Sequence, residues 1–183
     1  MVLAVVIYIL PPASTLTMKN SFERPEAILM IDMQRPFLED IQNAPELITR
    51  QLDVLSQFKH YNIPAIAIEY NNHGPTIPVL KDTLRRYEQS TSVQKPFDDG
   101  FLATRLDDLL QEREVKNVLL MGVNASACVR KTAIGGQRKY SFFTSAELIA
   151  DPAHWEQDYH NWYEANTHYT HTSKELFCKK IRL

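Results

Sequence analysis

The sequence has few of the features that mark secreted, membrane-spanning or nucleic-acid-binding proteins. It contains only two cysteines, Cys128 and Cys178, which form neither a disulfide framework nor a zinc-ligand pair, so we expect a reducing, cytoplasmic compartment. No Lys or Arg precedes Lys19, which argues against a signal peptide. The net charge of -2, with basic and acidic residues interspersed, argues against nucleic acid or an anionic membrane surface as the partner.

The apolar run at residues 2–10 is also too short for a membrane anchor. It has nine residues, whereas a helix needs about 20 to cross a bilayer. Because it is rich in Val and Ile, we expect a short strand that packs on the sheet edge or on a partner subunit. We treat residues 1–25 as an apolar N-terminal extension, with Met18 as an alternative start, and residues 26–183 as one domain with its own core.

The remaining sequence alternates short apolar runs with amphipathic stretches. Strands are predicted at residues 27–33, 64–70, 91–95, 116–123 and 140–145. Helices are predicted at residues 44–61, after Asp98 and Asp99, and at residues 128–140. Strands that alternate with helices favour right-handed βαβ crossovers. The predicted fold is therefore α/β, with three α-β-α layers and a mostly parallel central sheet. Gly135 and Gly136 weaken a helix, so another segment is expected to approach it closely there.

Three chemically active side chains lie at or just beyond predicted strand ends. Asp32 ends an apolar strand, where an unpaired acid would be costly, so it needs a partner. Lys95 ends another strand, and Cys128 follows a third at the start of a helix, where backbone amides favour a thiolate. Each residue alone has an ordinary explanation as a cap, a solvated charge or a buried thiol. Parallel topology brings the three together at one edge of the sheet, which predicts a site.

Three separated sequence blocks are similar to those of the isochorismatase-like hydrolases, also called cysteine hydrolases, which include nicotinamidases and carbamoyl-amide hydrolases. The similarity covers roughly residues 26–151. The blocks are Ile31-Asp32-Met33-Gln34 with Phe37, then Lys95 with Phe101 and Leu106, then Gly122-Val123 through Cys128-Val129 with Thr132-Ala133. Their order and spacing make the resemblance specific, and it implies an isochorismatase-like fold.

The resemblance also implies a catalytic triad and a mechanism without a cofactor. Asp32 would take the thiol proton, Lys95 would stabilise charge, and Cys128 would attack a carbonyl carbon. The amides of Asn124 and Cys128 would form the oxyanion hole, beside a cis peptide between Val123 and Asn124. Phe37 and Gln34 are expected to bind a small-molecule substrate.

The sequence departs from the family in two loops. Nicotinamidases build a metal site from one Asp and two His after the second strand, whereas this chain has only His73 there, so we predict no metal. The family often has Thr-Asp before the cysteine, where this chain has Ala125-Ser126. The substrate preference is therefore expected to differ.

Two other functions remain open. Isochorismatase-type hydrolysis of a vinyl ether would use Asp32 as a general acid and would not need Cys128. A catalytically silent scaffold would use the apolar prefix and the aromatic C-terminal region as interfaces. Members of the family self-associate, and the C-terminal aromatic residues agree, so we expect a homo-oligomer. His154, His160, His168 and His171 have no ligand spacing and are interpreted as surface or interface residues.

Overall fold

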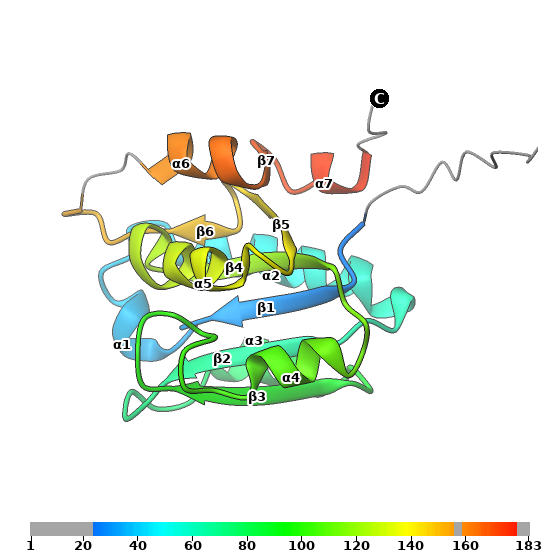
Figure 1. Cartoon of the computed structure of the whole chain (residues 1–183). Coiled ribbons are helices and arrows are strands. Elements are labelled where there is room, and N and C mark those ends of the chain that lie inside the picture. Colours follow the sequence, from blue (N-terminus) through cyan, green and yellow to red (C-terminus); the bar gives the residue numbers. More distant parts are fainter. Residues whose placement is uncertain (1–23, 156–158, 179–183) are drawn as a thin grey trace, which may run out of the picture.

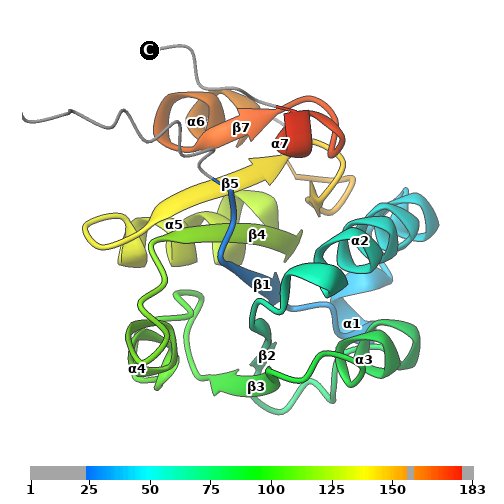
Figure 2. The ribbon, with the colours of Figure 1, turned by 90° about the vertical axis from the view of Figure 1, so that its right-hand side faces the viewer.

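The centre of the molecule is a parallel sheet (Figures 1 and 2). The computed structural model describes residues 24–155 and 159–178, so the predicted strand at residues 2–10 lies outside the described residues. The described sheet has seven strands in the order β3-β2-β1-β4-β5-β7, with β6 paired to β4, and every pair is parallel. The strands are β1 (Ala27–Ile31), β2 (Ala65–Tyr70), β3 (Ser90–Lys95), β4 (Asn117–Val123), β5 (Ser141–Ser145), β6 (Ile149–Ala150) and β7 (His168–Thr170).

Helices cover both faces of this sheet. Figure 2 shows α4, α5 and α6 on one face and α2 and α3 on the other. The helices are α1 (Arg35–Leu38), α2 (Ala44–Phe58), the 3-10 turn η1 (Lys59–Tyr61), α3 (Pro78–Leu84), α4 (Leu106–Gln111), the π-helix η2 (Ala125–Val129), α5 (Arg130–Gly136), α6 (Tyr159–Asn166) and α7 (Glu175–Cys178). The predicted three-layer α/β fold with a mostly parallel sheet is confirmed.

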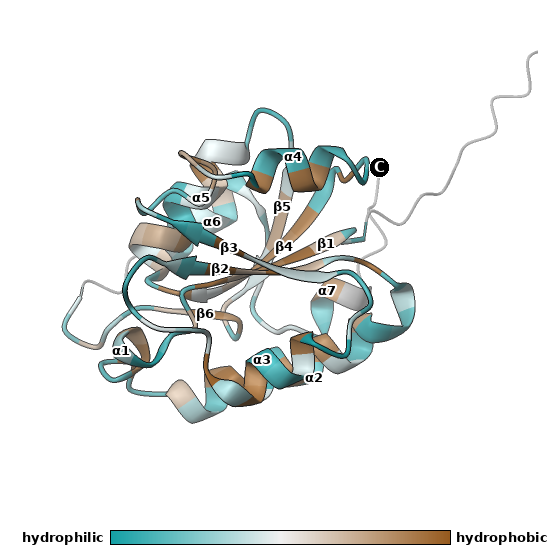
Figure 3. Cartoon of the chain, turned by 90° about the horizontal axis from the view of Figure 1, so that it is seen from below, coloured by the Kyte–Doolittle hydropathy of each residue, from teal (hydrophilic) through white to brown (hydrophobic). Residues whose placement is uncertain are grey.

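The core has two halves, one on each side of β1. All five residues of β1 are buried, as expected for a central parallel strand. Leu29 and Ile31 pack with the apolar residues of α4 and α5, whereas Ile28 and Met30 pack with those of α2 and α3. Figure 3 shows the hydrophobic strands lying between helices whose hydrophobic and hydrophilic residues alternate.

The strand order reverses between β1 and β4. The chain runs outward from β1 through β2 to β3, and later from β4 through β5 to β7 on the other side. Ligands bind to such sheets beyond the carboxyl ends of the strands at this reversal. Asp32 follows β1 and Asn124 follows β4, so the sequence-predicted site lies at this point.

The helix predicted after Asp98 and Asp99 begins later than expected. Residues 98–105 form turns, and α4 starts at Leu106. Asp99 Oδ1 accepts a hydrogen bond from the Phe101 amide at 2.8 Å, and Ala103 has a positive φ of 56°. A side-chain bond to a nearby amide competes with helical hydrogen bonding, which explains the delayed start.

The close approach expected at the two glycines of α5 is confirmed. A Cβ on Gly135 would lie 2.4 Å from an Asp99 carboxylate oxygen, and one on Gly136 would lie 2.6 Å from the Phe101 ring. The turns after β3 therefore pack directly on α5. This packing holds residues 98–101 beside the helix that follows Cys128.

The C-terminal aromatic residues belong mainly to the core, which corrects their interpretation as interface residues. Tyr159, Tyr163 and Tyr169 are buried, and the Tyr163 hydroxyl donates a hydrogen bond to the carbonyl oxygen of Ala125 at 2.7 Å. Helix α6 needs this apolar face to cover the sheet. His154 and His171 are exposed, as expected. Among the described helices, none combines the length and apolar character needed to cross a bilayer.

We predict that Gly122→Ala destabilises the fold much more than Gly74→Ala. Both glycines have positive φ, but a Cβ on Gly122 would lie 2.1 Å from the Ile31 carbonyl oxygen, whereas one on Gly74 would meet nothing within 4 Å. Urea unfolding should give a loss of about 4 kcal/mol for Gly122→Ala and about 1 kcal/mol for Gly74→Ala. Equal losses would show that the close approach of β1 and β4 is not the constraint.

Candidate active site

Asp32 is a fully buried carboxylate at the carboxyl end of β1. It has a positive φ of 53°, and its amide donates a hydrogen bond to the Ile68 carbonyl oxygen at 2.9 Å. The Lys95 Nζ lies 2.9 Å from its Oδ2, and both side chains are 0% exposed. Within the described part of the chain, neither carboxylate oxygen has a hydrogen bond of ordinary geometry. The ion pair with Lys95 is therefore what compensates for burying this charge.

Lys95 reaches Asp32 across an intervening strand. It ends β3, and β2 lies between β3 and β1. Its Nζ lies 4.2 Å from the centre of the Tyr70 ring and donates to the carbonyl oxygens of Phe97 at 3.3 Å and Asp98 at 3.5 Å. A long side chain packed over an aromatic ring can carry its charge into the interior in this way. The structure thus brings together the predicted Asp32 and Lys95.

Cys128 lies on η2, directly after β4 and opposite this ion pair. Its side chain is 3% exposed, and its Sγ lies 3.7 Å from Oδ1 of Asp98. The thiol also interacts with the Asp32 carboxylate. All three predicted catalytic residues therefore converge.

Burial governs the protonation of both reactive groups. Burial raises the pKa of the Cys128 thiol, the charges of Asp32 and Asp98 raise it further, and Lys95 opposes them. This differs from the thiolate favoured by the sequence analysis, because desolvation outweighs the helix-terminal amides. Burial also raises the pKa of Asp32, against the opposing charge of Lys95 and the nearby Cys128 thiol. Burial thus favours the neutral form of both groups, and the charge of Lys95 favours the ionised form of Asp32.

The turn that carries Cys128 differs from the expected one. No peptide bond among the described residues is cis, so the prediction of a cis bond between Val123 and Asn124 is wrong for this structure. Asn124 instead turns the chain with left-handed angles, φ 59° and ψ 63°. Its carbonyl oxygen accepts hydrogen bonds from the amides of Ala127 at 3.0 Å and Val129 at 3.2 Å. The oxyanion hole at the amides of Asn124 and Cys128 stays a prediction.

Asp151 supports this turn and was missed by the sequence analysis. It is buried directly after β6, and both its carboxylate oxygens accept the Ser126 amide, at 3.0 and 3.1 Å. Strand β6 pairs with Gly122 and Val123 at the end of β4, which brings Asp151 to the turn. The signal was available, because Asp151 follows a short apolar run just as Asp32 does.

Gln34 and Phe37, the predicted substrate contacts, have different environments. Gln34 is fully buried; its Nε2 donates to the carbonyl oxygens of Tyr70 and Gly74, and its Oε1 accepts the Tyr70 amide at 2.7 Å. A contact between its amide nitrogen and a substrate would require one of these bonds to break. Phe37 is partly buried and stacks on His73, with ring centres 4.8 Å apart, near Tyr70.

The residues after β2 do not fit the metal site of nicotinamidases. His73 stacks on Phe37, and its Nδ1 shares a hydrogen bond with the Asn71 carbonyl oxygen. Glu69, the nearby acid, is buried and already accepts the Thr76 amide and the Gln94 side chain. In the described part of the chain, no group of three or more His, Cys, Asp or Glu side chains is arranged to hold a metal.

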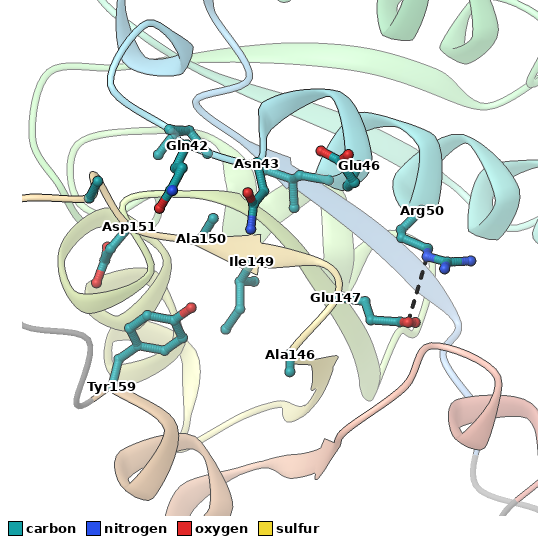
Figure 4. A pocket seen from close by; sticks show the side chains of 13 residues that line it. Gln42, Asn43, Glu46, Arg50, Ala146, Glu147, Ile149, Ala150, Asp151 and Tyr159 are labelled. Carbon is teal, nitrogen blue, oxygen red and sulfur yellow. Dashed lines mark ion pairs between the residues drawn. The ribbon is translucent and has the colours of Figure 1, made fainter.

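A cavity of about 450 Å³ lies between α2 and the segment around β6 (Figure 4). Residues of α2 and of the segment around β6 line it, including Asp151 and Tyr159. Arg50 and Glu147 form an ion pair of 3.6 Å at its edge. Asp32, Lys95 and Cys128 do not line this cavity. Asp151, which does line it, accepts the amide of Ser126 in the turn that carries Cys128.

Comparison with known proteins agrees with the fold. The family model of the Isochorismatase domain matches residues 26–141. Isochorismatase domain-containing protein 2 of Xenopus laevis is 27% identical over 116 residues, which are 61% of this chain and 53% of that protein. The chain thus spans about half the length of this curated relative.

Solved structures show the same fold. The nicotinamidase SaPncA of Staphylococcus aureus has a TM-score of 0.67 and 24% identity, over 78% of this chain and 90% of that one. The MAR1 ribonuclease of Caenorhabditis elegans has a TM-score of 0.70 and 25% identity, over 82% of this chain and 79% of that one.

We predict that Lys95→Met costs about 3–5 kcal/mol of unfolding free energy, because it leaves Asp32 buried without a cation. The double variant Asp32→Asn with Lys95→Met should be more stable than Lys95→Met alone. Urea unfolding of the wild type, both single variants and the double variant gives the coupling energy. Additive losses would show that the two groups do not depend on each other.

The loss in Lys95→Met should also shrink as the pH falls. Without Lys95, the pKa of Asp32 in the folded state rises further above its unfolded value. Such a group stabilises the fold at low pH and loses that contribution as the pH rises through the folded pKa. Unfolding measured at pH 5 and pH 8 should therefore give the smaller difference from wild type at pH 5.

Proposed function

Since the chain belongs to the isochorismatase family of hydrolases, we propose that it is a cysteine hydrolase of a small amide, ureide or related carbonyl compound. The reaction proceeds through a covalent thioester and uses no cofactor. Strands β5 to β7 continue the sheet past the matched residues, which supports one domain over residues 26–183. The assembly of the protein as a homo-oligomer and its cytoplasmic location stay predictions.

The observation that carries this proposal is the Cys128 thiol beside the buried ion pair of Asp32 and Lys95. Burying such a pair costs free energy unless the geometry is favourable. A fold that needed only a packed core would gain nothing from it. A nucleophile with a neighbouring base, and a base oriented by a third group, is the arrangement that covalent catalysis requires.

In the proposed first step, Asp32 takes the proton from the Cys128 thiol as Sγ bonds to the carbonyl carbon. The carbonyl oxygen gains the negative charge, and the amides of Asn124 and Cys128 stabilise it. When the tetrahedral intermediate collapses, Asp32 gives its proton to the departing nitrogen. The products of this half-reaction are an amine or ammonia and a thioester on Cys128.

In the second step, Asp32 accepts a proton from water, whose oxygen attacks the thioester carbon. Collapse releases the acid, and the proton on Asp32 returns to Sγ. Lys95 holds Asp32 in place throughout and offsets its charge, so the carboxylate can remain ionised although it is buried. The aromatic rings of Phe37, Tyr70 and His73 offer an apolar wall for the substrate near Lys95.

Hydrolysis of a vinyl ether is the second candidate, and the raised pKa of Asp32 favours it. A carboxylic acid that keeps its proton can serve as a general acid. That reaction would leave Cys128 without a role.

RNA cleavage is less favoured, because the carboxylates of Asp32 and Asp98 both face the thiol and would repel a phosphodiester.

We predict that Cys128→Ala abolishes amide hydrolysis while the unfolding curve stays close to that of the wild type. Asp32→Asn should also be inactive. Ammonia release from a panel of small amides and ureides, with nicotinamide included, measures this. The control is Lys139→Met. Lys139 forms an ion pair with Asp107 on α4, away from the site, so this variant should keep its activity.

The pattern of losses separates the candidates. If Cys128→Ala keeps its activity and Asp32→Asn loses it, the reaction is of the ether type. A wild-type protein that turns over neither amides nor vinyl ethers would favour the catalytically silent scaffold.

We predict that kcat/KM falls on the acid side with an apparent pKa above the ordinary value for aspartate of about 4. Burial raises the pKa of Asp32, and the group must be ionised to accept the thiol proton. Replacing Lys95 by Met should move this acid limb to higher pH, because the opposing cation is gone. An acid limb that does not move would exclude Asp32 as the titrating base.

A further inference from the structure

A second charged pair lies beside the thiol, and the mechanism above does not use it. Asp98 lies in the turns after β3, and Lys131 lies on α5. The Lys131 Nζ is 2.6 Å from Oδ2 of Asp98, with side-chain exposures of 56% and 34%. Unlike Asp32 and Lys95, both groups are open to solvent.

The two oxygens of Asp98 face different neighbours. Oδ1 lies 3.7 Å from Sγ of Cys128, whereas Oδ2 is held by Lys131. Lys131 lowers the pKa of Asp98, which keeps this carboxylate ionised. A ligand atom bonded to Sγ therefore meets the carboxylate of Asp98, while the ammonium of Lys131 lies behind it.

We propose that Asp98 selects the substrate of Cys128 by accepting a hydrogen bond from an N–H group next to the reacting carbonyl. The same carboxylate disfavours compounds that carry a carboxylate at that position. The favoured substrates are uncharged primary amides and ureides rather than esters or amides of acidic groups. This inference rests on the proposed function, because it assumes that the reacting carbon bonds to Sγ.

The chemistry of a carboxylate supports this selection. An ionised Asp accepts hydrogen bonds and donates none, so it can pair with an amide or ureide N–H but not with an ester oxygen. An anionic ligand group near 4 Å from Asp98 would be repelled strongly enough to slow its reaction about tenfold or more. Of the other charges that face the thiol, Asp32 and Lys95 form a pair of opposite sign and are unchanged by substitutions at Asp98.

Alkylation of Cys128 tests the proposal without any substrate. Iodoacetamide and iodoacetate have nearly the same shape, but the first carries an amide N–H₂ and the second a carboxylate. The ratio of their rates at one pH cancels the fraction of thiolate and reports the local charge. Peptide mapping by mass spectrometry separates labelling of Cys128 from labelling of Cys178.

We expect the ratio of iodoacetamide to iodoacetate rates to fall about tenfold in Asp98→Asn and to rise in Lys131→Met. The matched controls are Asp107→Asn and Lys139→Met. Their pair has a separation of 2.5 Å and exposures of 32% and 55%, similar to those of Asp98 and Lys131. Urea unfolding of each variant checks that the fold is kept. These control variants should leave the ratio at the wild-type value.

A ratio unchanged in Asp98→Asn would overturn the proposal. Failure of both reagents to reach Cys128 in the folded protein would also overturn it, because Asp98 and the thiol would then share no space open to a ligand. The result is independent of turnover. If the ratio falls in Asp98→Asn but the wild type hydrolyses no amide, Asp98 does select ligands by charge. The proposed hydrolysis would then be wrong.

Discussion

The rest of the site depends on the buried ion pair between Asp32 and Lys95. A carboxylate with no exposed atom would lose its charge unless a cation lay against it. Lys95 can supply that cation only because β2 and Tyr70 support its long side chain between β3 and β1. The ion pair therefore ties together three strands at the point where the strand order reverses. The thiol of Cys128 joins this pair from η2, directly after β4.

The same burial that makes the ion pair costly also shifts the pKa values of the groups beside it. It raises the pKa of the Cys128 thiol and the pKa of Asp32 from their ordinary values. In the proposed mechanism, proton transfer would therefore accompany attack on the substrate rather than precede it. Asp151 holds the turn of η2 through the Ser126 amide, and the ion pair of Asp98 and Lys131 lies beside the thiol. Asp98, Lys131 and Asp151 thus come from three different parts of the fold.

Much of this arrangement could be predicted from the sequence, because it follows from patterns that act locally. The apolar runs of β1 and β4, and the acid that ends the first of them, predicted where the site would lie. The two glycines of α5 predicted a close approach, although not that Asp99 and Phe101 would make it. The predicted start of α4 was wrong, because helical periodicity gives no sign of the hydrogen bond from the Phe101 amide to Asp99. The trans bond before Asn124, the raised pKa of Cys128 and the contact of Asp151 depend on packing between segments distant in sequence.

The most direct test of the central claim is intact-mass spectrometry of the protein, quenched with acid during turnover of an amide substrate. The account predicts a protein heavier by the acyl group, with the added mass on Cys128, removable by hydroxylamine and absent from Cys128→Ala. Two results together would contradict it: no acylated wild-type protein during turnover, and a Cys128→Ala variant that remains active.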